Sequence, residues 1–334
     1  MHDLKAEPIA INWTPELSIY ASGQFLEAVS DEYGWIGGHD RSRTLRCVLP
    51  YTIIRKAGVR MVRFRVETIP MGDGLSVEEE RSFLSNAIAY FRSINADIII
   101  PATTNAIFRT YPAGADAAPY GTYIIDLRQP EKLLWANLHS KHRNVIRSAN
   151  NKGVRILCGR EHADAAYQLV RDTFKRSALP FMEHDAFDRM LRGLGQQVNV
   201  FVAEHEGCVQ GCAVVPFSNH SAYYVYGGSI PEPVTGAMNL LQWEAIRQFH
   251  DQGVKQYDFC GVRIDPEKGS KQAGLMMFKE RFGPELRRGY MWKFSLNPLK
   301  SALYSLGIRV LRQGDIVDAE RAKLAGYSVS APDR

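Results

Sequence analysis

The segment Phe201–Gly207 (FVAEHEG) is followed closely by Ala213–Phe217 (AVVPF). Two apolar runs rich in β-branched residues thus flank a charged turn that contains glycine, and this pattern predicts a β-hairpin. The first half of the chain repeats the pattern, since Trp35–Asp40 (WIGGHD) leads through a polar turn to Cys47–Tyr51 (CVLPY). We therefore expect one strand–turn–strand unit in each half.

The two predicted hairpins also share spacing and context. The separation of His39 from Pro50 equals that of His205 from Pro216. Downstream of each hairpin, a helical run with the pattern Ala-Ile-x-x-Phe leads into a short apolar run. The two pairs of runs are 87–91 with 96–100, and 245–249 with 256–259. Such self-similarity indicates duplication of one domain, with chance similarity between two α/β segments as the alternative. The predicted fold class is α/β, with α+β mixed sheets, in two tandem domains.

A basic helix is predicted between the two halves, over Leu138–Lys152, with Gly153 as its C-terminal stop. We expect the domains to span 1–145 and 146–313, with 314–334 packing on the first domain. A chain of 334 residues is long enough for two such domains.

Another helix is predicted near the C-terminal end, with Asn297 as its N-cap and Pro298 as its first residue. Its apolar residues recur at helical spacing and form one stripe: Leu299, Leu303, Leu306 and Val310. We expect this stripe to pack back on the body of the protein. Because the helix also carries Lys300, Arg309 and Arg312, contact with an anionic membrane surface is the alternative.

The composition is that of an ordinary globular protein, with 45% apolar and 23% charged residues. No apolar run approaches the roughly 20 residues that a membrane-spanning helix needs. The first residues, Met1–Lys5, do not resemble a secretory signal, so a cytoplasmic protein is expected. The net charge of +5 favours a polyanionic partner where the charge is concentrated.

The five cysteines are scattered and odd in number, which argues against a disulfide framework. Cys208 and Cys212 lie close together, but no second pair of ligands accompanies them. We therefore predict no metal site, because free cysteine is commonly a small core residue.

Three stretches of the second half are similar to a known family. The first is the basic stretch Ser140–Val154. The second runs from Val200–Glu204 (VFVAE) through Ala222–Ser229 (AYYVYGGS) to Tyr257–Gly261 (YDFCG). The third and most specific is Gly274–Gly283 (GLMMFKERFG). Together they resemble the FemABX family of non-ribosomal peptidyltransferases. The similarity is clear over 138–293 and weak over 20–137.

The resemblance implies two tandem domains like the acyl-CoA N-acyltransferase (GNAT) fold. It also implies an aminoacyltransferase that moves an aminoacyl group from aminoacyl-tRNA to an amine of a peptidoglycan precursor or a related cell-envelope acceptor. No separate cofactor is implied. An acceptor of this kind would bring the cytoplasmic protein to the inner face of the membrane.

The sequence departs from the family where the acceptor's diphosphate would bind. Between Arg176 and Arg189, members of the family place a basic residue and a tyrosine, but the aligned residues here are Met182 and Ala186. In the first domain, Glu27–Tyr33 is acidic where a lysine would reach the same phosphates. These departures put recognition of the usual nucleotide-sugar acceptor in question.

Lys279 and Phe278, in the most specific stretch, are candidate catalytic residues. Acyl transfer to an amine passes through a tetrahedral oxyanion, which a preorganised cation stabilises. The apolar residues before Lys279 would remove water from its ammonium group and strengthen its field. By spacing alone, a lysine on the solvated face of a short helix is the alternative. Asp258 is a candidate general base, as is the donor's leaving hydroxyl, and a structural hydrogen bond is the alternative role of Asp258.

Tyr224 and Tyr226, together with Arg176, are candidates for binding the acceptor. If Tyr223–Tyr226 is a strand, Tyr224 and Tyr226 face the same side and would line a groove. Packing of the tyrosines between neighbouring strands is the alternative.

The basic helix carries candidates for binding tRNA, namely Lys141, Arg143 and Arg147, in a cluster that also contains His142, Lys152 and Arg155. Arg143 and Arg147 are one helical turn apart and share a face. Contacts from this face to phosphates would give sequence-independent, salt-sensitive binding of the acceptor stem. A solvated basic helix is the alternative.

Two other functions remain open. An N-acyltransferase that uses acyl-CoA would have the same fold, but the turn that would bind the CoA pyrophosphate is Pro231–Ala237 (PEPVTGA), whose prolines lack N–H donors. A non-catalytic RNA-binding relative is the other alternative, and the intact Phe278-Lys279 pair argues against it.

Overall fold

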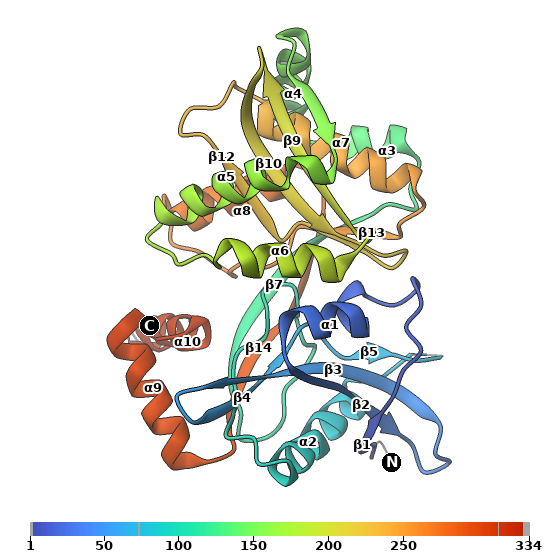
Figure 1. Ribbon diagram of the computed structural model, residues 1–334, viewed down its shortest axis with the longest axis vertical. Helices are drawn as coiled ribbons and strands as arrows, with labels where there is room; N and C mark the ends of the chain where they lie inside the picture. Colours follow the sequence, from blue (N-terminus) through green and yellow to red (C-terminus); the bar gives the residue numbers. More distant parts are fainter. Residues whose placement is uncertain (1–2, 73, 313, 330–334) are drawn as a thin grey trace, which may run out of the picture.

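Helices and strands alternate along the described chain, which confirms the predicted α/β class. The computed structural model describes residues 3–72, 74–312 and 314–329. Figure 1 shows two α/β halves stacked along the long axis, the N-terminal half below and the second half above. Two long strands, β7 (Asp116–Asp126) and β14 (Glu285–Ser295), connect the halves.

The first half consists of mostly antiparallel strands packed against α2, with β4 and β6 pairing in parallel. Its elements are β1 (Lys5–Ile9), η1 (Ile19–Ala21), α1 (Gly23–Val29), β2 (Glu32–His39), β3 (Leu45–Lys56), β4 (Val59–Phe64), β5 (Ile69–Pro70), α2 (Val77–Ser93) and β6 (Ile98–Ile99). A capping box between Ser76 and Glu79 starts α2. Phe83 and Phe91 on its apolar face are fully buried, and each such burial stabilises the fold by ~1.5–3 kcal/mol.

The second half contains a smaller sheet between two layers of helices. Its elements are α3 (Glu131–Asn137), α4 (Ser140–Asn151), β8 (Arg155–Cys158), η2 (Arg160–His162), α5 (Ala163–Lys175), α6 (His184–Leu194), β9 (Val198–His205), β10 (Cys208–Pro216), β11 (Ala222–Tyr223), β12 (Tyr226–Ser229), α7 (Ala237–Asp251), β13 (Gln256–Asp258) and α8 (Lys271–Glu280). Along β9, Phe201 faces the core that contains α7, whereas Val200 and Val202 face the core that contains α5 and α6. This alternation fixes both faces of the sheet.

The described strands form two sheets. The larger has ten strands in the order β1-β2-β3-β4-β6-β14-β7-β13-β11, with β5 pairing to β3. The smaller has the order β12-β10-β9-β8. Because β14 pairs with both β6 and β7, residues from near the C-terminal end complete the sheet of the first half.

Both predicted hairpins form, but their turns differ in length. In the second half, Glu206 and Gly207 make a two-residue turn with φ of 50° and 77°. In the first half, the turn spans 40–44 and is held by Asp40 Oδ1, which accepts hydrogen bonds from two backbone N–H groups. The prolines consequently have non-equivalent partners, Trp35 for Pro50 and Val198 for Pro216. The equal spacing of His and Pro is therefore not a structural correspondence.

The predicted basic helix is α4, and Gly153 follows it with φ of 82°. Each core draws residues from both sides of position 145. Tyr123 and Leu134 pack with α4 and α7 in the core of the second half, whereas Trp292 packs in the core of the first. A domain boundary between 145 and 146 stays a prediction.

The C-terminal helix α9 (Pro298–Arg312) begins as predicted, with Asn297 Oδ1 accepting a hydrogen bond from Lys300 N. The prediction that its apolar stripe packs on the body is wrong, because Leu299, Leu303 and Leu306 are 80%, 69% and 62% exposed. Polar contacts decide the orientation. Ser301 Oγ donates to the backbone oxygen of Asp97, which turns the leucines outward. The side chain of Val310 lies outside the described residues.

The last helix, α10 (Ile316–Val329), packs on β7 and β14. Val317 is fully buried there beside Tyr120 and Met291. Lys293 on β14 adds ion pairs to Asp315 and Asp318. The described part of the predicted segment 314–334 thus lies against the long strands, and its last five residues lie outside the described range.

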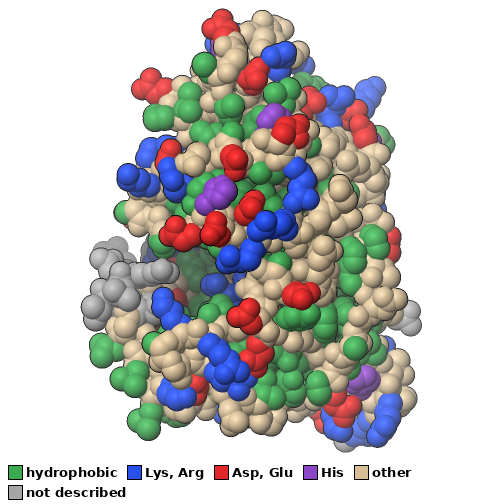
Figure 2. Space-filling model, in the orientation of Figure 1, with side chains coloured by type: hydrophobic (Ala, Val, Ile, Leu, Met, Phe, Trp, Pro, Cys, Tyr) green, Lys and Arg blue, Asp and Glu red, His purple; other side chains and the backbone are tan. Residues whose placement is uncertain are grey.

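The two halves also touch through α1 and α6. Gly193 permits this close approach, since a Cβ there would lie 2.0 Å from Ala28 Cβ. Phe25 and Leu26 of α1 join the same core as Leu191 of α6. A hollow remains between the halves, visible at the left of Figure 2 with charged side chains around its rim.

Candidate functional site

Lys279 lies near the C-terminal end of α8, and its side chain reaches the end of β13. Its Nζ donates hydrogen bonds to the backbone oxygens of Cys260 (2.7 Å) and Gly261 (2.9 Å). Burial lowers the pKa of the ammonium group, while Cys260 and Asp258 act in the opposite direction. Lys279 is therefore a half-buried cation fixed by backbone dipoles, rather than a side chain extended into solvent.

An unusual turn presents these two carbonyl groups. Cys260 and Gly261 have left-handed φ values of 50° and 59°. This conformation is strained for a residue with a side chain and persists only where the surroundings impose it. At Gly261 a Cβ would lie 2.8 Å from Thr104 Cβ, so a larger residue would not fit. The turn directs two successive carbonyl oxygens at one ammonium group.

Asp258, at the end of β13, is buried beside this turn. Its Oδ1 accepts hydrogen bonds from Thr122 Oγ1 and from the backbone N–H of Cys260. Burial raises the pKa of the carboxyl group, and these hydrogen bonds and the charge of Lys279 oppose the rise. Asp258 thus makes the hydrogen bonds expected of a structural residue, which was the alternative to a general base. Its carboxyl group also interacts with the charge of Lys279.

Phe278 orients α8 through packing. Its ring lies 5.5 Å from the His142 ring and 5.3 Å from the Phe282 ring, between centroids. His142 Nε2 also hydrogen-bonds with the backbone oxygen of Phe278 at 3.0 Å. Because this contact joins α4 to α8, Phe278 lies where it would position the neighbouring Lys279.

Tyr224 and Tyr226 do not share one face. The strand is interrupted between β11 and β12, so the expected alternation across Tyr223–Tyr226 is wrong. Tyr224 packs against Phe259 on the α7 side, whereas Tyr226 packs against Phe181 on the α5 and α6 side. A shared acceptor groove lined by both rings is therefore not formed.

Arg176 is exposed at the end of α5. Its guanidinium donates to Thr173 Oγ1 (2.9 Å) and to the backbone oxygen of Ser229 (2.6 Å). These bonds tie α5 to the end of β12, near Tyr226. Acceptor binding by Arg176, Tyr224 and Tyr226 stays a prediction.

The basic side chains of α4 are in different environments. Lys141 is exposed. Arg143 donates to the backbone oxygens of Ala136 and Leu138, at the end of α3, and Arg147 lies over the Trp135 ring at 5.4 Å. His142 is not part of the basic surface, because it is buried between α4 and α8 and burial lowers its pKa. Lys141 and Arg147 remain available to a polyanion.

The start of α7, where a CoA-dependent enzyme would bind pyrophosphate, is covered by α4. A Cβ at Gly236, the N-cap residue, would lie 2.1 Å from the backbone oxygen of Val145. Ala237 is fully buried, and Gln210 Oε1 accepts a hydrogen bond from Val234 N in the preceding turn. The helix end thus faces protein, which disfavours an anion there.

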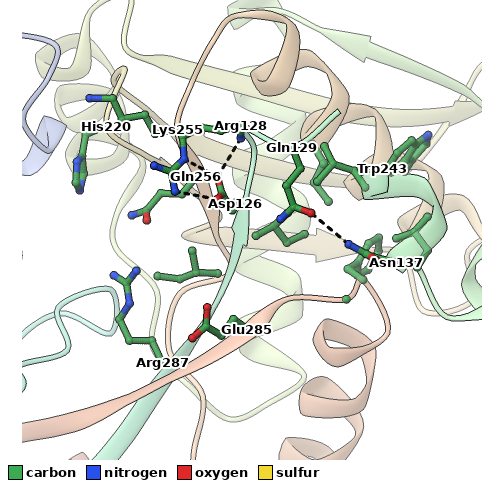
Figure 3. A pocket seen from close by; sticks show the side chains of 17 residues that line it. Asp126, Arg128, Gln129, Asn137, His220, Trp243, Lys255, Gln256, Glu285 and Arg287 are labelled. Carbon is green, nitrogen blue, oxygen red and sulfur yellow. Dashed lines mark hydrogen bonds and ion pairs between the residues drawn. The ribbon is translucent and has the colours of Figure 1, made fainter. Parts of the chain in front are cut away.

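A pocket of about 390 Å³ lies where β7, β13 and β14 meet (Figure 3). Asp126 pairs with Arg128 in this pocket. Arg287 points toward His220, whose pKa is lowered by burial and by the charges of Lys255 and Arg287. The charge of Arg287 also opposes the rise in the pKa of Asp258, so this cation acts on groups at both the pocket and the Lys279 turn.

Comparison with known proteins supports the fold and the transferase class. The family model described as acetyltransferase (GNAT) domain matches residues 137–271. The lipid II:glycine glycyltransferase of Staphylococcus epidermidis is 33% identical over 85 residues, and that of Staphylococcus aureus is 30% identical over 132 residues. A crystal structure of FemX covers 89% of this chain and 99% of its own, with a TM-score of 0.64 at 15% identity. Part of the chain is thus homologous to the lipid II:glycine glycyltransferases.

This Fem homologue matches only part of its curated relatives. The alignments cover 25% of the chain and 20% of the S. epidermidis protein, and 37% of the chain and 31% of the S. aureus protein. The likeness to FemX supports the fold across both halves. The predicted family resemblance is confirmed.

Sequence reasoning missed Glu67. The residue follows β4 in a segment without helical or strand periodicity, so no local pattern marks it. In the structure, its Oε2 is buried without a hydrogen-bond partner among the described residues. Its charge acts on Asp258, Tyr223 and Cys260 around the Lys279 turn.

Proposed function

We propose that this Fem homologue moves an aminoacyl group from aminoacyl-tRNA to an amine of a peptidoglycan precursor or a related cell-envelope acceptor. The observation that carries the proposal is Lys279, fixed by the carbonyl groups of Cys260 and Gly261 beside Asp258. The name lipid II:glycine glycyltransferase, borne by the curated relatives, supports acyl transfer to a cell-wall acceptor.

The geometry of Lys279 suits stabilisation of an oxyanion. An ammonium group has three N–H donors, and two of them point at the carbonyl oxygens of Cys260 and Gly261. During transfer, the acceptor's amine nitrogen bonds to the ester carbonyl carbon, and the carbonyl oxygen becomes negatively charged. The ester C–O bond then breaks and releases the tRNA hydroxyl. The third N–H of Lys279 would stabilise the oxyanion in a site that excludes much of the water.

Two features favour aminoacyl-tRNA over acyl-CoA as donor. The start of α7 is covered by Val145 of α4, so the usual cradle for a pyrophosphate is closed. On α4, Lys141 is exposed and Arg147 lies on the surface over Trp135, where both would contact RNA phosphates. An acyl-CoA N-acyltransferase and a non-catalytic RNA-binding relative are the competing functions.

Donor choice is the decisive experiment. The purified protein is incubated with an amine acceptor and either labelled aminoacyl-tRNA or labelled acyl-CoA, and deacylation of each donor is followed. We expect acceptor-dependent deacylation of the tRNA alone. Turnover of acyl-CoA alone would support the N-acyltransferase, and tRNA binding without turnover of either donor would support the RNA-binding relative.

The contribution of α4 is measured by the salt dependence of tRNA binding. Replacing Lys141→Gln and Arg147→Gln together should weaken binding and reduce the slope of log affinity against log salt by about two units at most. Arg143 is left intact because its bonds hold the end of α3. Lys56→Gln, at the exposed end of β3 in the first half, is the matched control. If the slope is unchanged in the double variant, α4 does not bind tRNA and serves only in packing.

We further propose that α9 contacts an anionic membrane surface. Leu299, Leu303 and Leu306 lie three and four residues apart on one helical face and are all exposed. Exposed apolar residues on a helix that also carries basic residues are typical of binding at a lipid surface. Among the described helices, none is both long and apolar enough to cross a membrane. Contact at the inner face of the membrane would bring the protein to a lipid-linked acceptor.

A further inference from the structure

The backbone that precedes Glu67 is held in place by hydrogen bonds. The backbone oxygen of Arg65 accepts them from Thr103 Oγ1 (3.1 Å) and Asn105 Nδ2 (2.8 Å). Val66 is buried in the core that also contains Tyr223 and Cys260. The segment of the first half that carries Glu67 therefore packs in the same core as Cys260 of the Lys279 turn.

The charged and titratable groups around Glu67 come from both halves. Burial, and then the charges of Asp258 on β13 and Glu80 on α2, raise the pKa of Glu67 to about 7. A bond to its own backbone N–H and the charge of Arg287 on β14 oppose the rise. Glu67 in turn raises the pKa values of Tyr223 and Cys260.

The two carboxyl groups at this site differ in their hydrogen bonds. Asp258 Oδ1 already accepts from Thr122 Oγ1 and from the N–H of Cys260. Glu67 Oε2 is buried and has no partner within the described chain. Native proteins rarely leave a buried carboxylate oxygen unpaired, because its desolvation is unfavourable without a hydrogen bond. The open partner position on Glu67 suits a cationic donor from a ligand.

We infer that Glu67 receives the ammonium group of the acceptor and removes its proton, which makes Glu67 a catalytic residue for the proposed transfer. This inference rests on the proposed function. The ammonium first donates a hydrogen bond to Oε2 and gives up one proton to the carboxylate. The neutral nitrogen then forms its bond to the ester carbon, and the ester C–O bond breaks. The nitrogen's second proton leaves with the tRNA oxygen, so the products are an amide, the tRNA hydroxyl and protonated Glu67.

The position of Asp258 agrees with this division of roles. Asp258 interacts with the charges of both Lys279 and Glu67. The charges of Lys279 and Glu67 therefore act on the same buried carboxyl group. In the proposed reaction Lys279 is the oxyanion donor and Glu67 the proton acceptor. A base whose pKa is near 7 is effective at neutral pH, because it is largely ionised yet still takes a proton.

The first test compares pH profiles of transfer for the wild type and Glu67→Gln, with Glu232→Gln on an exposed loop as the matched control. In the wild type, kcat/KM for the acceptor should rise with pH through about 7, as Glu67 ionises. In Glu67→Gln, kcat/KM should no longer rise with pH near 7, and at pH 7.5 it should be ~10²-fold lower than in the wild type, as for loss of a general base. If Glu67→Gln shows the same rise in kcat/KM near pH 7 and the same rate as the wild type, the inference is wrong.

The second test measures amine binding without any donor. The probe is N-acetyl-lysine methylamide, and the same molecule acetylated on its side-chain nitrogen is the neutral control. Titration followed by NMR should show wild-type binding of the charged probe that weakens about tenfold in Glu67→Gln, with weak and equal binding of the neutral control. Equal binding of the charged probe by both proteins would contradict the inference. If the wild type transfers nothing from aminoacyl-tRNA, the proposed function fails, yet this result still decides the role of Glu67.

Folding of the variant is checked by its melting temperature. The pKa of folded Glu67 lies above its ordinary value, so its contribution to stability is present at low pH and is lost as pH rises through about 7. Glutamine mimics the neutral carboxyl group. Glu67→Gln should therefore melt higher than the wild type at pH 8 and similarly at pH 4. A lower melting temperature at pH 8 would show that Glu67 has a stabilising partner, which contradicts the inference.

Discussion

Each half of the chain has a helix whose charged side chain contacts the segment that follows a short strand. The two halves differ in the group that neutralises or binds this charge. In the first half, Glu80 of α2 is buried and pairs at 2.7 Å with Arg109, in the segment that follows β6. In the second half, Lys279 of α8 donates to the carbonyl oxygens of Cys260 and Gly261, after β13. Glu80 thus meets a full opposite charge, whereas Lys279 meets backbone dipoles.

This difference separates a structural use of charge from a chemical one. An ion pair neutralises both partners and leaves little field outside the pair. Carbonyl dipoles hold an ammonium group in one place without cancelling its charge, so the field remains available to a developing oxyanion. The comparison predicts that the first half loses stability when its cation is removed, and that the second half loses turnover.

Removing the charge of Lys279 should have the largest effect. Lys279→Met keeps most of the apolar volume, so the protein should fold while turnover falls by ~10²- to 10³-fold. Donor binding should change little, because the interaction develops mainly in the transition state. Single-turnover kinetics and a binding titration measure the two effects. Lys271→Met, at the exposed start of the same helix, is the matched control. Full activity in Lys279→Met would mean that Lys279 is not the oxyanion donor.

Removing Arg109 should have the opposite outcome. Arg109→Met leaves Glu80 buried and unpaired, and the free energy of unfolding should fall by about 2–3 kcal/mol at pH 8, a value reduced because Arg109 is 43% exposed. Burial already raises the pKa of Glu80, and loss of the cation raises it further. The destabilisation should therefore shrink at pH 4, where the carboxyl group is protonated in the folded state.

Denaturant unfolding at the two pH values measures this change, and turnover per folded molecule should equal that of the wild type. Arg55→Met is the matched control, because Arg55 pairs with Glu32 on the surface and surface pairs contribute only about 0–1 kcal/mol. A loss of turnover without a loss of stability in Arg109→Met would remove the contrast between the halves.

The smallest effect is expected on α9, which lies outside both charged sites. Leu303→Ser with Leu306→Ser should weaken binding to vesicles of phosphatidylglycerol and phosphatidylcholine, measured by sedimentation, by about 30-fold, since partial burial of each leucine contributes about 1 kcal/mol. Turnover with a water-soluble acceptor should not change. Leu324→Ser on α10, also an exposed leucine, is the control. Equal vesicle binding by all three proteins would exclude the membrane contact.

Local patterns predicted several elements of the fold. Both hairpins formed because alternating apolar runs flank turns that tolerate left-handed φ. The helix α4 and its stop at Gly153 followed from the helical spacing and the glycine. The stretch Gly274–Gly283 indicated the family, which the comparisons confirmed.

Predictions failed where a long-range partner decided orientation. The spacing of the leucines on α9 predicts that their stripe packs on the body. Instead, the hydrogen bond from Ser301 to Asp97 turns the stripe outward. His142 was counted with a basic surface, but it is buried against Phe278 and Phe282. In each case the helix was predicted correctly and the face was not, because helical periodicity does not specify which face meets the body.

The sequence by itself determined the class of fold, several of its elements, and Lys279 as the candidate for oxyanion stabilisation. Only the tertiary structure decided what surrounds that lysine. Glu67 belongs to the first half, and Asp258 and Lys279 to the second. The charge of Asp258 acts on Glu67 because one sheet, which includes β7 and β14, runs through both halves. The buried, unpaired oxygen of Glu67 exists only once these halves pack, since an unfolded chain keeps every carboxylate hydrated.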